Sequence, residues 1–127
     1  MKTVISTAEA PAAVGPYAQG IAAGPFVFCS GQIPLDPATG NLVEGGIAAQ
    51  AERVLKNLSA VLDAAGLGFA DVVKTTIFLA DIDDFATVNG IYATYMPDPP
   101  PARSTFAVAA LPKGAIVEIE AIAVRGR

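Results

Sequence analysis

The most informative absence in this sequence is histidine. None of the 127 residues is a histidine, and Cys29 is the single cysteine. Without histidine the chain cannot build a Ser-His-Asp triad, a Cys-His pair or most zinc sites. Neither a GxGxxG nor a GxxxxGK[ST] pattern occurs, which excludes the dinucleotide and P-loop fingerprints. Any catalysis must therefore use carboxylates, hydroxyls, arginine, backbone groups or the Cys29 thiol.

Charge is also scarce. Charged residues make up 16% of the chain and apolar residues 53%, against typical shares of about 25% and about 45–50%. The longest apolar runs fall far short of the roughly 18–20 residues that span a bilayer, which excludes the membrane as the place for this apolar excess. A chain of this length forms one domain, residues 1–127, whose interior is too small to bury all of the apolar side chains. Composition alone therefore predicts a homo-oligomer.

The sign of the charge restricts the partners. A net charge of −4 and a pI near 4.5 argue against nucleic acid, which requires a concentrated basic surface. Met1-Lys2 runs directly into Thr3-Val4-Ile5 with no apolar leader, and a lone cysteine cannot form an internal disulfide. We therefore expect a cytoplasmic protein that acts on a small molecule.

Periodicity predicts two helices and about six strands. The helices cover residues 46–65, where apolar side chains recur every 3.6 positions, and a stretch from a cap at Asp81 or Asp83 to about Met96. We interpret the cluster of Asp81, Asp83 and Asp84 as helix capping and expect no metal site there. The predicted strands are residues 2–5, 21–23, 26–30, 72–80, 103–109 and 115–124.

This order of elements predicts an α+β fold, with both helices packed on one face of a six-stranded, mostly antiparallel sheet. No helix remains to cover the other face. Strands as apolar as 72–80 and 116–124 cannot face water on both sides, so this open face is where we expect subunits to meet.

Arg103 is the first candidate site residue. It follows a proline-rich run and begins an otherwise apolar strand, so its guanidinium is held at a defined place. Such a group can clamp a carboxylate through two parallel hydrogen bonds. An edge arginine, or one in a structural ion pair, is the alternative.

Glu118 and Glu120 alternate with apolar residues and share one face of the last strand. If residues 111–114 form a simple hairpin, Ala109 pairs with Ile116, and Arg103 lies on the same face as both acids. Burying a carboxylate in so apolar a strand costs free energy unless the group is paired, takes part in function or faces solvent. Spacing leaves open which of the two would act.

Several blocks of the chain, in order and over nearly its whole length, resemble the Rid family, the reactive-intermediate deaminases also called the YjgF family. The blocks are Ala10-Pro11, Gly15-Pro16-Tyr17, Ser30-Gly31-Gln32-Ile33-Pro34, Lys74-Thr75-Thr76-Ile77-Phe78-Leu79, Asp84-Phe85-Ala86-Thr87-Val88-Asn89, Pro101-Ala102-Arg103-Ser104, Leu111-Pro112-Lys113-Gly114 and Val117-Glu118-Ile119.

The resemblance implies a chorismate-mutase-like fold and a homotrimer with three clefts between subunits. It implies a 2-iminobutanoate/2-iminopropanoate deaminase that hydrolyses 2-imino acids to 2-oxo acids and ammonia without a cofactor or metal.

By position, the resemblance implies that Arg103 binds the substrate carboxylate. It implies that Glu118, rather than Glu120, positions or activates the water. Backbone groups beside Thr105 would hold the imine nitrogen; some relatives carry cysteine there, so no thiol role is general. The remaining cleft residues would be Tyr17, Ser30, Gly31 and Asn89.

Two other functions stay open. The same cleft could bind a keto or amino acid as a regulator without turnover. Some family members are described as ribonucleases or translation inhibitors, a function that the acidic charge and the absence of histidine disfavour in this chain.

Overall fold

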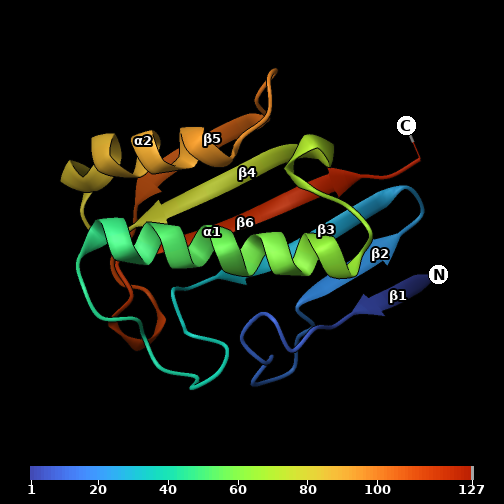
Figure 1. Cartoon of the computed structure of the whole chain (residues 1–127), viewed down its shortest axis with the longest axis horizontal. Helices are drawn as coiled ribbons and strands as arrows, with labels where there is room; N and C mark the ends of the chain where they lie inside the picture. Colours follow the sequence, from blue (N-terminus) through green and yellow to red (C-terminus); the bar gives the residue numbers. More distant parts are fainter. Residues whose placement is uncertain (127) are drawn as a thin grey trace.

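The computed structural model describes residues 1–126, and it has two α-helices on one face of a six-stranded mixed sheet (Figure 1). The strand order is β1-β2-β3-β6-β4-β5. The elements are β1 (Lys2–Ile5), β2 (Gly20–Ala23), β3 (Phe26–Gln32), α1 (Ile47–Ala64), β4 (Val72–Leu79), α2 (Phe85–Tyr95), β5 (Ala102–Ala107) and β6 (Val117–Val124). Every predicted helix and strand is present, so the predicted fold class is confirmed.

The core lies between the helices and one face of the sheet. Helix α1 buries the face predicted from its period, including Val54, Leu58 and Val61, against β3 and β6. The helix stops where Gly66 takes a left-handed conformation at φ 76°. A short 3-10 helix precedes α2, and the Asp81 carboxylate caps it by accepting a hydrogen bond from the Asp83 backbone nitrogen at 2.9 Å.

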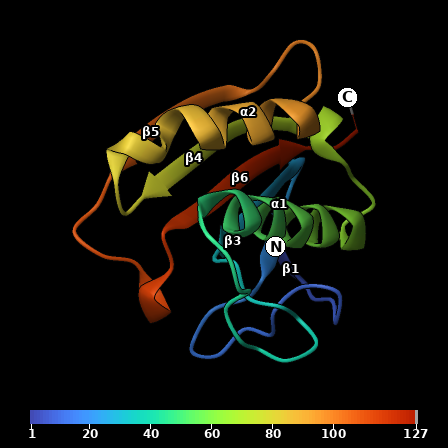
Figure 2. The ribbon, with the colours of Figure 1, turned by 60° about the vertical axis from the view of Figure 1, so that its left-hand side comes forward.

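Strand β5 lies at the sheet edge and runs parallel to β4, while the other paired strands are antiparallel. Helix α2 makes the crossover between the two parallel strands, beside which it lies in Figure 2. The predicted hairpin between the last two strands is therefore wrong, because β4 separates β5 from β6. Strand β6 buries every second residue and lies in the middle of the sheet, paired on both sides. Strand β5 has no fully buried residue.

This topology separates the two main candidate residues. Arg103 pairs with Thr75, which is fully buried on the helix-covered face of β4. Glu118 pairs with Phe78, three residues further along β4 and hence on the other face. The prediction that Arg103 and Glu118 share a face is wrong: within one chain they lie on opposite faces of the sheet.

The second face of the sheet is uncovered and apolar, as predicted. Phe26 and Phe28 in β3 are each 44% exposed, and Phe106 in β5 is 45% exposed. Phe28 pairs with Ile122 of β6, and Phe106 with Phe78 of β4, so these rings form one surface across the sheet. Among the helices of residues 1–126, none is long and apolar enough to cross a membrane.

Candidate active site

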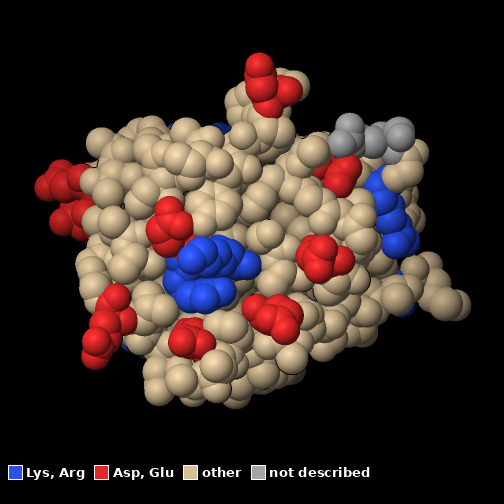
Figure 3. All heavy atoms as spheres, viewed as in Figure 1, with Lys and Arg blue, Asp and Glu red and all other residues tan. Residues whose placement is uncertain are grey.

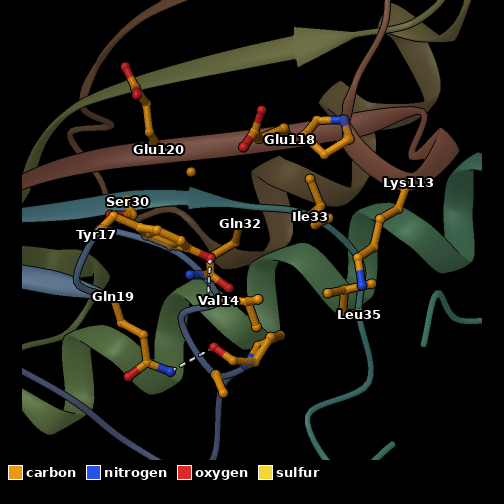
Figure 4. A pocket seen from close by; sticks show the side chains of 14 residues that line it. Val14, Tyr17, Gln19, Ser30, Gln32, Ile33, Leu35, Lys113, Glu118 and Glu120 are labelled. Carbon is orange, nitrogen blue, oxygen red and sulfur yellow. Dashed lines mark hydrogen bonds between the residues drawn. The ribbon is translucent and has the colours of Figure 1, made fainter. Parts of the chain in front are cut away.

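A cavity of about 610 Å³ lies where β3, β6 and two loops meet (Figure 4). It contains four of the residues implied by the family resemblance: Tyr17, Ser30, Gly31 and Glu118. Its other lining residues are mostly apolar and come from segments far apart in the sequence, namely Pro11, Ala12, Val14, Gln19, Gln32, Ile33, Leu35, Pro112, Lys113 and Glu120.

A β-bulge shapes the floor of this cavity. Cys29 pairs with Ala121 and Gln32 with Ile119, so two residues, Ser30 and Gly31, lie opposite one residue of β6. A bulge bends its strand and is common beside active sites.

Glycine at position 31 makes room for the Glu118 carboxyl group. A Cβ atom built on Gly31 would lie 2.5 Å from Oε2 of Glu118, well inside van der Waals contact. The carboxylate thus lies directly against the backbone of the bulge, in space that a side chain at position 31 would occupy. A side chain at position 31 would therefore displace the Glu118 carboxyl group from this place.

Glu118 is also set apart by its electrostatics. The side chain is half-buried, and this burial raises the pKa of the carboxyl group above its ordinary value of 4.5; the negative charge of Glu120 raises it further. Both acids project from the same side of β6 (Figure 4), but Glu120 is exposed. A carboxylate with a raised pKa is suited to accept a proton near neutral pH.

The loop that forms one wall of the cavity is held by Gln19, which sequence reasoning missed. Gln19 is 4% exposed, and its side-chain nitrogen donates to the carbonyls of Thr7, Ala10 and Pro11 at 3.0, 3.3 and 2.7 Å. Its side-chain oxygen accepts from the Thr7 backbone nitrogen at 2.7 Å. A lone glutamine among small residues carries no pattern that would have identified this role.

Tyr17 and Ser30 are bonded within the cavity wall. The Tyr17 hydroxyl accepts from the Val14 backbone nitrogen at 3.3 Å, while its side chain remains 53% exposed. The Ser30 hydroxyl donates to the Ala18 carbonyl at 2.6 Å. Its single proton is therefore engaged, and the hydroxyl can offer a ligand only an acceptor.

Arg103, Asn89 and Thr105 lie apart from this cavity. Arg103 and Asn89 line a separate hollow of about 620 Å³ between α2, β5 and the proline-rich loop. Nη1 of Arg103 donates to Oδ1 of Asn89 at 2.7 Å. Thr105 pairs with buried Ile77, which puts it on the same face as Arg103, and its buried Oγ1 has no hydrogen-bond partner among residues 1–126.

Cys29 does not belong to the reactive groups. It is buried, and burial raises the pKa of its thiol to about 11. Because the thiolate is the reactive form, this cysteine is inert near neutral pH.

Comparison with known proteins places the chain in a family. The family model described as Endoribonuclease L-PSP matches residues 7–125. Over 126 residues the chain is 55% identical to a rat protein, and over 126 residues 52% identical to a human protein, each named 2-iminobutanoate/2-iminopropanoate deaminase. Both alignments cover 99% of this chain and 92% of the relative.

Solved structures share the whole fold. The YjgF gene product of E. coli is 48% identical, with a TM-score of 0.92 over 98% of this chain and 99% of its own. E. coli TdcF, solved with bound serine, is 45% identical, with a TM-score of 0.91 over the same shares. The chain therefore belongs to the Rid family, whose family model is described as Endoribonuclease L-PSP.

Proposed function

We propose that this protein is a 2-iminobutanoate/2-iminopropanoate deaminase, which hydrolyses reactive 2-imino acids to 2-oxo acids and ammonia. The observation that carries the proposal is the half-buried Glu118, with its raised pKa, over the glycine of a β-bulge in a largely apolar cavity. Mammalian relatives at 52–55% identity over nearly their full length bear this name. A small-molecule carboxylate is the substrate class.

The proposed cleft needs two copies of the chain. Glu118 and Arg103 lie on opposite faces of the sheet, so one chain cannot direct both at the same small molecule. The exposed aromatic residues on the face of Glu118 provide an apolar surface for a second copy. We therefore propose a homotrimer in which each cleft combines Arg103 of one subunit with Glu118 of its neighbour.

In this cleft the reaction needs no metal or cofactor, because the carbon of an imine is already electrophilic. Arg103 holds the substrate carboxylate, and Glu118 accepts a proton from the water that adds to the imine carbon. The nitrogen takes up that proton and a carbinolamine forms. Glu118 then transfers the remaining hydroxyl proton to nitrogen as the C–N bond breaks, so imine and water become 2-oxo acid and ammonia. Fixing the carboxylate and the water replaces a random encounter with an aligned one, which lowers the barrier by several kcal/mol.

A direct assay tests the proposal. An amino-acid oxidase generates imino acids in situ, and the appearance of 2-oxo acid and ammonia is followed with and without the protein. We expect release faster than the uncatalysed rate with the wild-type chain and near that rate with Glu118→Gln. If the wild type accelerates the hydrolysis of no imine, the proposed function is wrong.

Mixing two inactive variants tests the shared cleft. Arg103→Lys and Glu118→Gln subunits are unfolded together, mixed in equal amounts and refolded, and the activity is compared with each variant refolded alone. If every cleft takes one residue from each of two subunits, random trimers regain about a quarter of their clefts in wild-type form. A mixture with no more activity than its components would mean that both residues serve the same cleft from one chain. Sedimentation equilibrium that gives a monomer would contradict the trimer itself.

The pH dependence of kcat/KM should reveal the influence of Glu120. The base is the ionised form of Glu118, so activity falls as the pH drops through a pKa that burial and Glu120 both raise. Glu120→Gln removes one of these causes, so its acid limb should lie at lower pH than that of the wild type. A neighbouring Arg103 would lower the same pKa, but equally in both proteins. An acid limb that moves to higher pH in Glu120→Gln would contradict this account.

A binding regulator is the second candidate, since the TdcF structure at 45% identity holds serine. A ribonuclease is less well supported. Basic side chains on the face that carries the helices are interspersed with acidic ones rather than gathered in a patch (Figure 3). The net charge of −4 also opposes binding to a phosphate backbone. A cytoplasmic location remains a prediction from cysteine usage.

A further inference from the structure

The guanidinium group of Arg103 is held in an aromatic cradle that neither the family resemblance nor the proposed mechanism assigns. Its central carbon lies 5.1 Å from the ring centroid of Tyr92 and 5.6 Å from that of Phe85. Asn89, which accepts from Nη1, lies between these two on α2. The three residues follow one another at i, i+4 and i+7, so they form one stripe of the helix facing β5.

The Tyr92 ring, one wall of the cradle, is held in place by a residue of β4. Tyr92 is 5% exposed, and its hydroxyl lies 2.6 Å from Oγ1 of Thr75, which is fully buried. Thr75 is also the β4 residue that pairs with Arg103. The backbone that carries the arginine and the ring that holds its guanidinium are thus tied to the same residue.

The cradle leaves the charge of Arg103 unneutralised. Among residues 1–126, the side-chain partners of the guanidinium are an amide and two rings, all neutral, and none of them is a carboxylate. A carboxylate in the place of Asn89 would compete with an anionic ligand. Aromatic faces attract a cation through their quadrupole and keep its charge available.

We propose that Phe85 and Tyr92 are positioning residues: they restrict the guanidinium of Arg103 to one orientation so that its free nitrogen atoms meet the substrate carboxylate. This inference rests on the proposed function, which gives Arg103 that carboxylate. It predicts that the rings act on ligand affinity rather than on the chemical step, because they contact the guanidinium, which holds the carboxylate and takes no part in the proton transfers.

Leucine variants test this role. Phe85→Leu and Tyr92→Leu remove a ring, and each should raise KM for the imino acid and the Kd for a 2-oxo acid, measured by calorimetry, by about three- to thirty-fold. In both, kcat should stay within about two-fold of the wild type, since Glu118 is untouched. Tyr92→Phe loses the bond to Thr75 but keeps the ring, so it should restore most of the affinity lost in Tyr92→Leu. Phe85 is 36% exposed, so Phe85→Leu gives a readout even if Tyr92→Leu does not fold.

Tyr95→Leu is the matched control. Tyr95 is on the same helix but packs against Phe69 and donates to Glu52, away from Arg103. Its loss should reduce thermal stability without changing KM or Kd. If Phe85→Leu and Tyr92→Leu bind the 2-oxo acid as tightly as the wild type, the cradle has no positioning role. Equal falls in kcat and affinity in all three leucine variants would point to general destabilisation and also overturn the inference. A wild type that neither binds a 2-oxo acid nor hydrolyses an imine would instead refute the proposed function, and this inference with it.

Discussion

Replacing Glu118 with glutamine should reduce the kcat of imine hydrolysis by roughly 10²–10⁴, the usual contribution of a general base. Glutamine keeps the shape of the side chain and its contact with the bulge at Gly31, but its amide cannot accept a proton from water. The effect should fall on the chemical step because, in the proposed cleft, the substrate carboxylate is held by Arg103. Steady-state kinetics with oxidase-generated imines measures kcat, and calorimetry with a 2-oxo acid should show an affinity close to that of the wild type.

Glu120→Gln is the matched control for this variant. Glu120 projects from the same strand two residues away, yet it is exposed and does not lie over Gly31. It should shift the pH profile and leave the maximal rate close to the wild-type value. Equal losses of kcat in Glu118→Gln and Glu120→Gln would point to an effect on folding or assembly. A wild type that binds 2-oxo acids with no measurable hydrolysis of any imine would favour the regulator.

Replacing Arg103 with lysine should abolish most of the activity and leave the proposed trimer intact. Lysine keeps the positive charge but loses the planar fork that can donate two parallel hydrogen bonds to a carboxylate. It also loses the flat surface that rests against Phe85 and Tyr92. Each lost charged hydrogen bond is worth about 1.5–3 kcal/mol, so kcat/KM should fall by about 10–100-fold or more.

The control for this change is Arg125→Lys. Arg125 donates to the Gly24 carbonyl in the turn between β2 and β3, so this variant makes the same chemical change outside the site. It should keep both its turnover and its sedimentation behaviour. Turnover near the wild-type level in Arg103→Lys would mean that Arg103 is only a structural edge residue, the alternative that the sequence left open.

Much of the fold could be predicted from local patterns. The 3.6-residue period of α1 and the alternation of β6 gave the type of each element correctly, with ends within a few residues. These signals are local, because a side chain's face is set by its position along one helix or strand. The uncovered sheet face followed from counting apolar strands against helices.

The pairing of the last two strands could not be predicted in this way. A short link between two strand-like segments suggests a hairpin, but strand pairing depends on competition between all strands for central and edge places. Here β6 buries every second residue and lies between β3 and β4, while β5, which has no fully buried residue, lies at the edge. The order of the strands along the chain does not predict the outcome of that competition.

By itself, the sequence determined the chemical repertoire of this protein: no histidine, one cysteine, and a small set of acids and arginines in an apolar chain. It also determined the secondary structure, since both depend on residue type and on spacing along the chain. Only the tertiary structure decided that Glu118 rests on Gly31, that Arg103 is cradled by α2, and that the two lie on opposite faces of one sheet. Burial, charge and facing depend on which distant segments pack together, and that is fixed by the fold as a whole.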